Sequence, residues 1–140
     1  MLARITPRFD ALPANDVETP ARVDPIVERA LELMHADPGA DWTVSSLAKA
    51  TGCSRAVFAR RFAAATGTTP RAFLTLVRMH VAAKHLVHGE AGLAAIAAMV
   101  GYATEFAFGR AFKRVFRMAP GRFRRAMWKR SVTSAIQAAA

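Results

Sequence analysis

One face of a predicted helix combines an aromatic side chain with cations. In GYATEFAFGRAFKRVF, residues 101–116, a turn of about 100° per residue places Phe106 about 160° away from the apolar stripe that contains Phe108. Phe106 instead shares a sector with three cations, Arg110, Lys113 and Arg117. Arg can donate two hydrogen bonds to guanine O6 and N7, Phe can pack on the thymine methyl, and Lys can neutralise a phosphate. In the alternative interpretation, Phe106 packs against a neighbouring helix and Arg110 is an ordinary surface charge.

The elements that carry this face are predicted to be helices. Asp24 and Pro25 start an amphipathic segment that ends at "DPG", residues 37–39, as expected for an N-cap followed by proline. Thr43 and Ser54 are suitable caps for the next two helices, and a long helix is expected from Pro70 to about His88. Strand patterns are absent, so the sequence predicts an all-α fold of about seven helices.

An internal repeat organises these helices into two similar halves. The first short helix and its corner recur 49 residues later, with Leu47 matching Ile96 and Gly52 matching Gly101. The second helix and the start of the next recur 50 residues later: Ser54, Phe58, Phe62, Pro70 and Phe73 match Thr104, Phe108, Phe112, Pro120 and Phe123. The offset changes by one inside the corner, so the second corner has one extra residue. The sequence therefore predicts two helix–turn–helix units.

The outward faces of the two second helices correspond position by position. In the first helix Ala56, Arg60 and Ala63 point away from the apolar face, with Ala59 beside them. The matching residues of the second helix are Phe106, Arg110 and Lys113, with Gly109 beside them. Small residues around one central Arg favour a face that another surface approaches closely.

The charge of the chain is strongly segregated. Residues 1–41 hold four Arg and eight acidic residues, a net charge of −4, whereas residues 42–140 hold sixteen Lys and Arg with only Glu90 and Glu105, a net charge of +14. A polyanionic partner is the simplest reason to tolerate that self-repulsion, although a solvated basic surface remains the alternative. Hydrophobic residues make up 53% of the chain, which excludes global disorder.

Enzyme and metal chemistry are poorly supported by the residues present. Glu90 and Glu105 are too few for a paired-carboxylate site, and Cys53 has no evident His partner. His85 and His88 stand three residues apart on a predicted helix, but neither an acid nor a Cys completes a metal site. A glycine-rich phosphate loop is also absent from the sequence. We therefore expect no catalysis, no metal and no cofactor.

Three segments together resemble a known family: TVSSLAKATGCSRAVFARRF, TGTTPRAFLTLVRMHVAAKHL and IAAMVGYATEFAFGRAFKRVFRMAPGRFRR. Over about residues 24–127 they resemble the DNA-binding domain of the AraC/XylS family of bacterial transcription regulators. The resemblance implies sequence-specific binding of double-stranded DNA, with two recognition helices in successive major grooves. The candidate DNA-binding residues are then Ser54, Arg55, Ala56, Ala59, Arg60, Thr104, Glu105, Phe106, Gly109, Arg110 and Lys113.

The expected organisation has five parts. A flexible arm, 1–23, precedes a first helix–turn–helix subdomain, 24–69; a linker helix, 70–88, leads to a second subdomain, 89–128, and a frayed or weakly helical tail, 129–140. The chain departs from the family pattern at Arg117, where Gly often ends the second recognition helix. No effector-binding or dimerisation domain is expected before residue 24, which fits either an excised domain or a small regulator acting alone.

Location and partners complete the expectations. A single Cys, no signal-like N-terminus, and an apolar run of only eight residues, 93–100, favour the cytoplasm over secretion or a membrane. Besides duplex DNA, RNA polymerase is a partner that such a regulator could contact, as an activator or a repressor. The alternative function is a basic interaction module that binds RNA or an anionic membrane through residues 121–130, although Phe123 repeats the core position Phe73.

Overall fold

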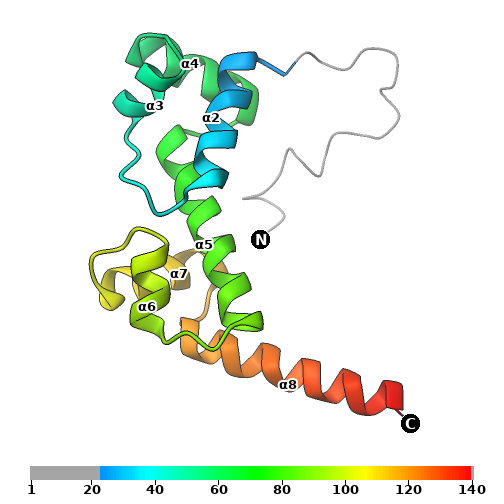
Figure 1. Ribbon diagram of the computed structural model, residues 1–140. Coiled ribbons are helices and arrows are strands. Elements are labelled where there is room, and N and C mark those ends of the chain that lie inside the picture. The colour runs from blue at the N-terminus through cyan, green and yellow to red at the C-terminus, as the bar shows by residue number, and fades with distance from the viewer. Residues whose placement is uncertain (1–22, 140) are drawn as a thin grey trace, which may run out of the picture. The chain divides into compact units, whose positions relative to one another are not determined.

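The computed structural model describes residues 23–139, which are built from helices and connecting turns (Figure 1). The helices are α2 (Pro25–Ala36), α3 (Val44–Ala50), α4 (Arg55–Thr66), α5 (Pro70–His88), α6 (Leu93–Met99), α7 (Glu105–Phe116) and α8 (Pro120–Ala139). These seven helices, with no strand among the described residues, confirm the all-α prediction. The predicted arm, except for Val23, lies outside the described residues.

The described residues divide into two compact units, unit 1 up to Val77 and unit 2 from Arg78 onward. The division falls within α5, so one part of this helix belongs to each unit. In unit 1, α2, α3 and α4 pack together; in unit 2, α6 and α7 pack on each other and α8 follows them (Figure 1). Each unit therefore contains one short helix, one corner and one second helix.

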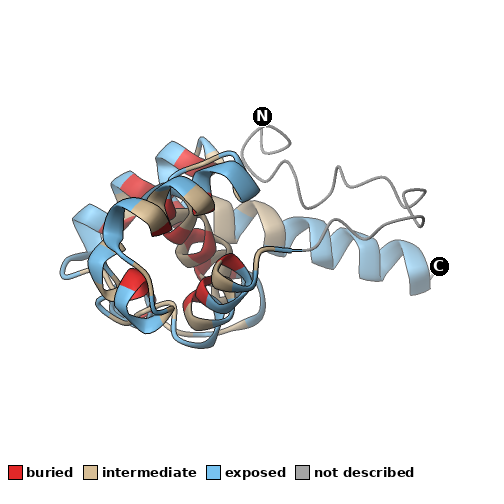
Figure 2. Ribbon diagram, turned by 90° about the horizontal axis from the view of Figure 1, so that it is seen from above, coloured by how far each residue is buried: buried red, intermediate tan, exposed pale blue. Residues whose placement is uncertain are grey.

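Unit 1 forms its core where α2 covers the α3–α4 pair. Val27, Ala30 and Met34 of α2 are buried with Leu47 of α3 and Phe58 of α4, shown in red where buried in Figure 2. The start of α2 is capped as predicted, because a side-chain oxygen of Asp24 accepts a hydrogen bond from Ile26 N at 3.0 Å. A capping box between Thr43 and Ser46 likewise begins α3.

The Asp24 carboxylate also joins α2 to α4. Arg61 Nε and Nη2 each donate a hydrogen bond to Asp24, both at 2.7 Å, in a two-point pair across 37 residues of sequence. The hydrogen bonds from Arg61 lower the pKa of Asp24 below its ordinary value of 3.8. The Asp24 carboxylate thus caps α2 and also neutralises an arginine of α4.

Aromatic packing repeats almost unchanged in the two units. The ring centroids of Phe58 and Phe62 lie 5.7 Å apart, and those of Phe108 and Phe112 lie 5.8 Å apart. The next helix supplies an edge-on partner in each unit: Phe73 lies 5.5 Å from Phe62, and Phe123 lies 5.2 Å from Phe112. Edge-to-face contacts at these distances are favourable. This agreement confirms the repeat that the sequence predicts.

The extra residue of the second corner is Ala103. Cys53 N donates to Ala48 O at 3.0 Å in the first corner, and Tyr102 N donates to Ala97 O at 2.9 Å in the second. These two hydrogen bonds are equivalent, so Cys53 and Tyr102 still match at an offset of 49 residues. Ser54 and Thr104 match at an offset of 50, so the inserted residue lies between Tyr102 and Thr104. Gly52 and Gly101 have φ of 79° and 87°, a left-handed conformation that glycine adopts without steric cost.

Arg117 ends α7 in a conformation that usually requires glycine. Its φ is 65° and its N–H donates to Lys113 O, while Gly67 ends α4 with φ of 76° and the matching hydrogen bond to Ala63 O. The departure from the family pattern therefore leaves the C-cap intact. Holding a non-glycine residue there costs about 1 kcal/mol, which the hydrogen bond and the packed helix offset.

The end of α5 is held by an arginine of α8. Arg124 Nε donates to Leu86 O at 3.1 Å, and Arg124 Nη2 donates to Ala91 O at 2.7 Å. Leu86 is one of the last four residues of α5, whose carbonyls have no partner within the helix. Arg124 thus satisfies backbone acceptors inside unit 2 and is a structural residue.

Helix α8 continues past the boundary that the sequence predicts at residue 128. It runs to Ala139, and all of its residues from Trp128 onward are exposed (Figure 2). The sequence predicts only a weakly helical tail here. After Gly121 there is neither glycine nor proline to end the helix, which explains the difference.

The Asp24–Arg61 pair leads to a pH-dependent prediction. Asp24→Asn keeps an N-capping side chain but removes the charge. A lowered folded-state pKa stabilises the protein above the unfolded pKa, and this contribution disappears as pH falls through the folded value. Urea unfolding should therefore show Asp24→Asn to be less stable at pH 7, with the difference from the unsubstituted chain shrinking below about pH 4.

The control removes an exposed ion pair instead. Glu32 accepts from Arg29 at 3.3 Å on the surface of α2, and exposed pairs contribute only about 0–1 kcal/mol. Glu32→Gln should therefore change the unfolding midpoint little. If Asp24→Asn were destabilised relative to the unsubstituted chain by the same amount at pH 2.5 as at pH 7, the charge of the pair would not stabilise unit 1.

Candidate nucleic-acid interface

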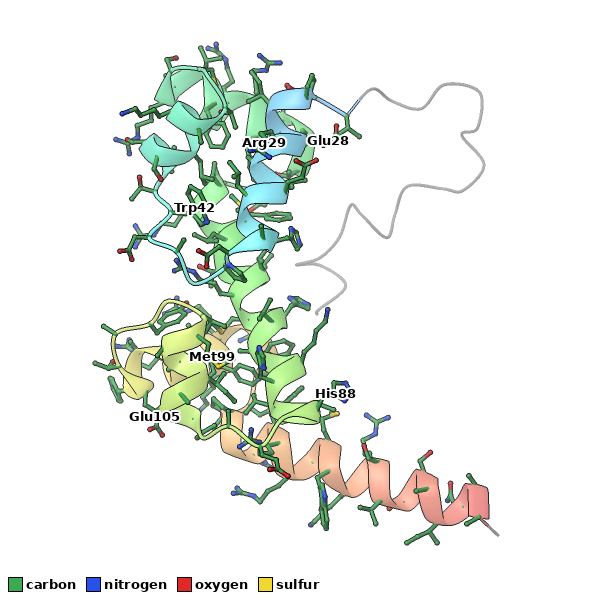
Figure 3. The ribbon with its side chains drawn as sticks, viewed as in Figure 1. Glu28, Arg29, Trp42, His88, Met99 and Glu105 are labelled. Carbon is green, nitrogen blue, oxygen red and sulfur yellow. The ribbon has the colours of Figure 1, made fainter. Side chains whose placement is uncertain are left out.

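The candidate residues form one outward surface on each second helix. On α4 they are Ser54, Arg55, Ala56 and Arg60, all exposed, and Ala59, half-buried; on α7 they are Thr104, Glu105, Phe106, Arg110 and Lys113, all exposed, and Gly109, half-buried. Figure 3 shows the Glu105 side chain at the outer surface of unit 2. Each helix therefore brings its own set together within its own unit.

The two caps hold the first turn of each helix in place. Ser54 Oγ accepts from Val57 N at 3.3 Å, and Thr104 Oγ1 accepts from Ala107 N at 3.0 Å. Each hydroxyl keeps its own hydrogen to donate to an outside acceptor such as a phosphate oxygen. The caps therefore serve the fold while standing at the edge of the outward surface.

Phe106 is exposed, as its angular position predicts. Its side chain is 75% exposed, whereas Phe108, two residues later, is completely buried. The guanidinium carbon of Arg110 lies 5.8 Å from the centre of the Phe106 ring, within the range of a cation–π contact. The alternative in which Phe106 packs against a neighbouring helix is wrong within the described residues. Phe106 and Arg110 instead form one joint surface.

Gly109 has no steric reason within this structure to be glycine. A Cβ built on Gly109 would meet no atom within 4 Å apart from its own helix backbone and its neighbours. Its counterpart in the first repeat is Ala59. Glycine in the interior of a helix costs about 1 kcal/mol relative to alanine. The absent side chain thus clears space on the outward surface next to Arg110.

On α4, the two adjacent arginines have different environments. Arg60 is exposed on the outward surface, while Arg61 is half-buried and bound to Asp24. Neutralisation by Asp24 therefore leaves Arg60 as the central cation of a surface otherwise lined by Ala56, Ala59 and Ala63. The side chains around Arg60 are thus small, whereas those around Arg110 include Phe106 and Lys113 beside Gly109.

The last turn of α7 adds cations that the candidate set does not include. An open concavity of about 350 Å³ is lined by Arg110, Lys113, Arg114 and Arg117. At about 100° per residue, Arg114 and Arg117 fall in the same sector as Phe106 and Arg110. Extending the helical angles by one turn would therefore have identified Arg114 as well.

Other candidate sites are absent from the described part of the chain. Residues 23–139 contain no group of three or more His, Cys, Asp or Glu that could hold a metal ion. None of the described helices is long and apolar enough to cross a membrane. Figure 3 shows His88 at the end of α5, where no metal-ligand set surrounds it. The outward surfaces of α4 and α7 are the strongest candidate for function.

Comparisons with known proteins agree on the type of domain. Residues 47–126 match the helix-turn-helix domain family. A putative AraC-like transcription regulator of Streptomyces antibioticus is 47% identical over 102 residues, which is 73% of this chain and 34% of that protein. The chain thus spans about a third of the length of the curated relatives it matches.

Two solved structures extend this similarity to the fold. The C-terminal domain of AraT, a response regulator from Geobacillus stearothermophilus, is 32% identical, with a TM-score of 0.72 over 76% of this chain and 88% of that one. The DNA-binding domain of the global transcriptional factor AdpA, solved with a target DNA, is 26% identical, with a TM-score of 0.72 over 76% and 96%. This chain belongs to the AraC family of helix-turn-helix transcription regulators.

Proposed function

We propose that this chain binds double-stranded DNA sequence-specifically and acts in transcription regulation, with α4 and α7 as its recognition helices. The observation that carries the proposal is the outward surface of α7. It combines an exposed Phe106, the Arg110 guanidinium beside it, and a glycine that only an external surface would require. Base edges in a major groove match this combination of groups.

Each recognition helix would use its central arginine in the same way. Arg60 and Arg110 are repeat partners on exposed surfaces, and arginine paired with guanine O6 and N7 is the commonest specific base contact. Arg55 and Glu105 differ at the first position of the two helices, so the two half-sites should differ in sequence. Glutamate can accept a hydrogen bond from cytosine N4, whereas arginine cannot accept one.

The two units on one chain favour a site without dyad symmetry. One chain carries both recognition helices, so successive major grooves about 10 base pairs apart could be read without a second copy. We expect an asymmetric site of about 20 base pairs. The relatives named above are transcription regulators, which supports a role in regulating transcription. We further propose RNA polymerase as a partner and the cytoplasm as the location.

The alternative of a basic module for RNA or membranes has less support. Phe123, the aromatic residue at the start of the basic segment, contacts Phe112 and Phe116 with centroids at 5.2 and 5.3 Å. Arg124 is committed to backbone carbonyls. The side of α8 that holds these two residues is therefore occupied within unit 2, whereas the outward surfaces of α4 and α7 are open.

Selection of bound fragments from a random duplex library tests the proposed function. We expect one asymmetric site with a guanine opposite each central arginine. Arg60→Ala and Arg110→Ala should each weaken that site by about 1–3 kcal/mol and relax the preference at one guanine only. Lys129→Ala, an exposed cation of α8, is the matched control and should leave base preferences unchanged. Recovery of no preferred sequence would contradict specific recognition.

Phe106 and Phe108 give a paired test of the outward surface. Phe106→Ala should change the free energy of unfolding by no more than about 1 kcal/mol, while Phe108→Ala should cost about 3–5 kcal/mol. In the selected site, replacing the thymine opposite Phe106 by uracil, which lacks only the methyl, should weaken binding of the unsubstituted chain. Phe106→Ala should be indifferent to this replacement. Equal sensitivity of both proteins to uracil would refute the methyl contact.

Gly109→Ala separates the demands of folding from those of binding. Alanine is the better helix former and its Cβ has free space, so the melting temperature should rise, by an amount equivalent to about 0.4–1 kcal/mol. DNA affinity should fall because the methyl occupies space that the duplex needs. Ala59→Gly on α4 is the reciprocal control and should lower stability without weakening binding. A Gly109→Ala protein that binds as tightly as before would show that the duplex does not approach this position.

A further inference from the structure

The concavity at the end of α7 is lined by cations alone. Arg110, Lys113, Arg114 and Arg117 surround about 350 Å³ of open space. Glu105, at the first position of α7, is the last acidic residue of the sequence, so the remainder of α7 and all of α8 contribute cations but no acidic side chain. Four like charges on two turns of helix repel one another, and this arrangement is stable only at a cost.

The first repeat lacks three of these four cations and keeps only Arg60, the match of Arg110. The partners of Lys113, Arg114 and Arg117 are Ala63, Ala64 and Gly67. Gly67 and Arg117 are both left-handed C-caps with the same hydrogen bond, so the backbone of the two helix ends is equivalent. The fold therefore does not require cations here. Even the left-handed position, where glycine is unstrained, carries an arginine in the second repeat.

The position of the concavity along α7 separates it from the base-contacting residues. Phe106 and Gly109 belong to the first half of the helix, whereas Lys113, Arg114 and Arg117 lie about 6–12 Å beyond Gly109 along the axis. Recognition helices contact base edges mainly through their N-terminal residues. The C-terminal end of α7 then lies where the helix leaves the groove, beside the sugar–phosphate strand.

We propose that Lys113, Arg114 and Arg117 form a phosphate clamp, which binds consecutive phosphates of one DNA strand and has no equivalent on α4. The clamp deepens the proposed function and rests on it. Unit 2 thus provides the larger share of the salt-dependent affinity, whereas unit 1 contributes mainly through Arg60 and the small side chains around it. An open, cationic concavity suits a continuous strand better than a small organic ligand, whose pockets are mostly enclosed and apolar.

The test converts the end of α7 into the end of α4. Lys113→Ala/Arg114→Ala/Arg117→Gly reproduces Ala63, Ala64 and Gly67, and glycine adopts the left-handed cap readily. Helical content and cooperative unfolding should be retained, as checked by circular dichroism. Binding of the selected duplex and of a random duplex is then titrated from 50 to 200 mM NaCl. The slope of log K against log salt should become shallower by about 2–3, and the ratio of the two affinities should change less than about threefold.

Two further variants isolate the cause. Lys84→Ala/Lys129→Ala/Arg130→Ala removes three exposed cations from α5 and α8, and should change the slope by less than one. Arg114→Lys/Arg117→Lys keeps the charges and should keep the slope. A clamp variant whose slope matches the unsubstituted chain, or falls no more than this control, overturns the clamp while leaving DNA binding intact. No binding of any duplex by the unsubstituted chain would overturn the proposed function itself.

Discussion

The burial of two phenylalanines one turn apart sets the rotation of each second helix, and every outward position follows from it. Phe58 and Phe62 are completely buried on α4, as are Phe108 and Phe112 on α7. Exposing each such side chain would cost about 1.5–3 kcal/mol, so the pair accounts for a large part of the stability of a small unit. Phe73 and Phe123 then close the same side of the two helices from α5 and α8. Rotation of either helix about its axis is therefore excluded.

Because the inward residues carry the packing, the outward residues are free to differ between the repeats. Arg60 and Arg110 keep one cation at the centre of each surface, but Ala56 is replaced by Phe106 and Ala59 by Gly109. Neither replacement improves the fold, since Phe106 is 75% exposed and Gly109 lacks a packing partner for a Cβ. A large apolar ring beside a missing side chain matches a surface that has both a protruding group and a close wall. Base edges and a groove wall have this shape.

Periodicity and capping residues predict most of the fold but not the partners of long side chains. Helix α5 begins and ends at the predicted residues, and the caps Asp24, Thr43, Ser54 and Thr104 accept the expected hydrogen bonds. These features depend on residues close together in sequence. The bonds of Arg61 to Asp24 and of Arg124 to Leu86 O span 37 and 38 residues. Helical angles alone do not contain that information.

In the candidate interface, too, helical angles predict some features and miss others. The exposure of Phe106 follows from a helical angle, and it was predictable once Phe108 was assigned to the core. The positive φ of Arg117 is not predictable in this way, because a left-handed helix end normally carries glycine. Ala103 could be counted as an extra residue but placed only through the hydrogen bonds of Tyr102. Sequence thus predicts the surfaces that follow from regular helix geometry. The structure is needed to find exceptions to that geometry, such as the left-handed Arg117 and the inserted Ala103.

Net charge consequently overstates how much of this chain can act on a polyanion. Of the sixteen cations after residue 41, Arg61 is paired with a carboxylate and Arg124 is bound to two carbonyls, so both are held inside their units. Neither can move to a phosphate without breaking bonds that stabilise the fold. Lys113 and Arg114 of α7 differ in that no acidic residue follows them in the sequence and they line open space. Binding depends on where the cations lie more than on the total charge, because a cation held by bonds within the fold is less available to neutralise a phosphate and release its counterions.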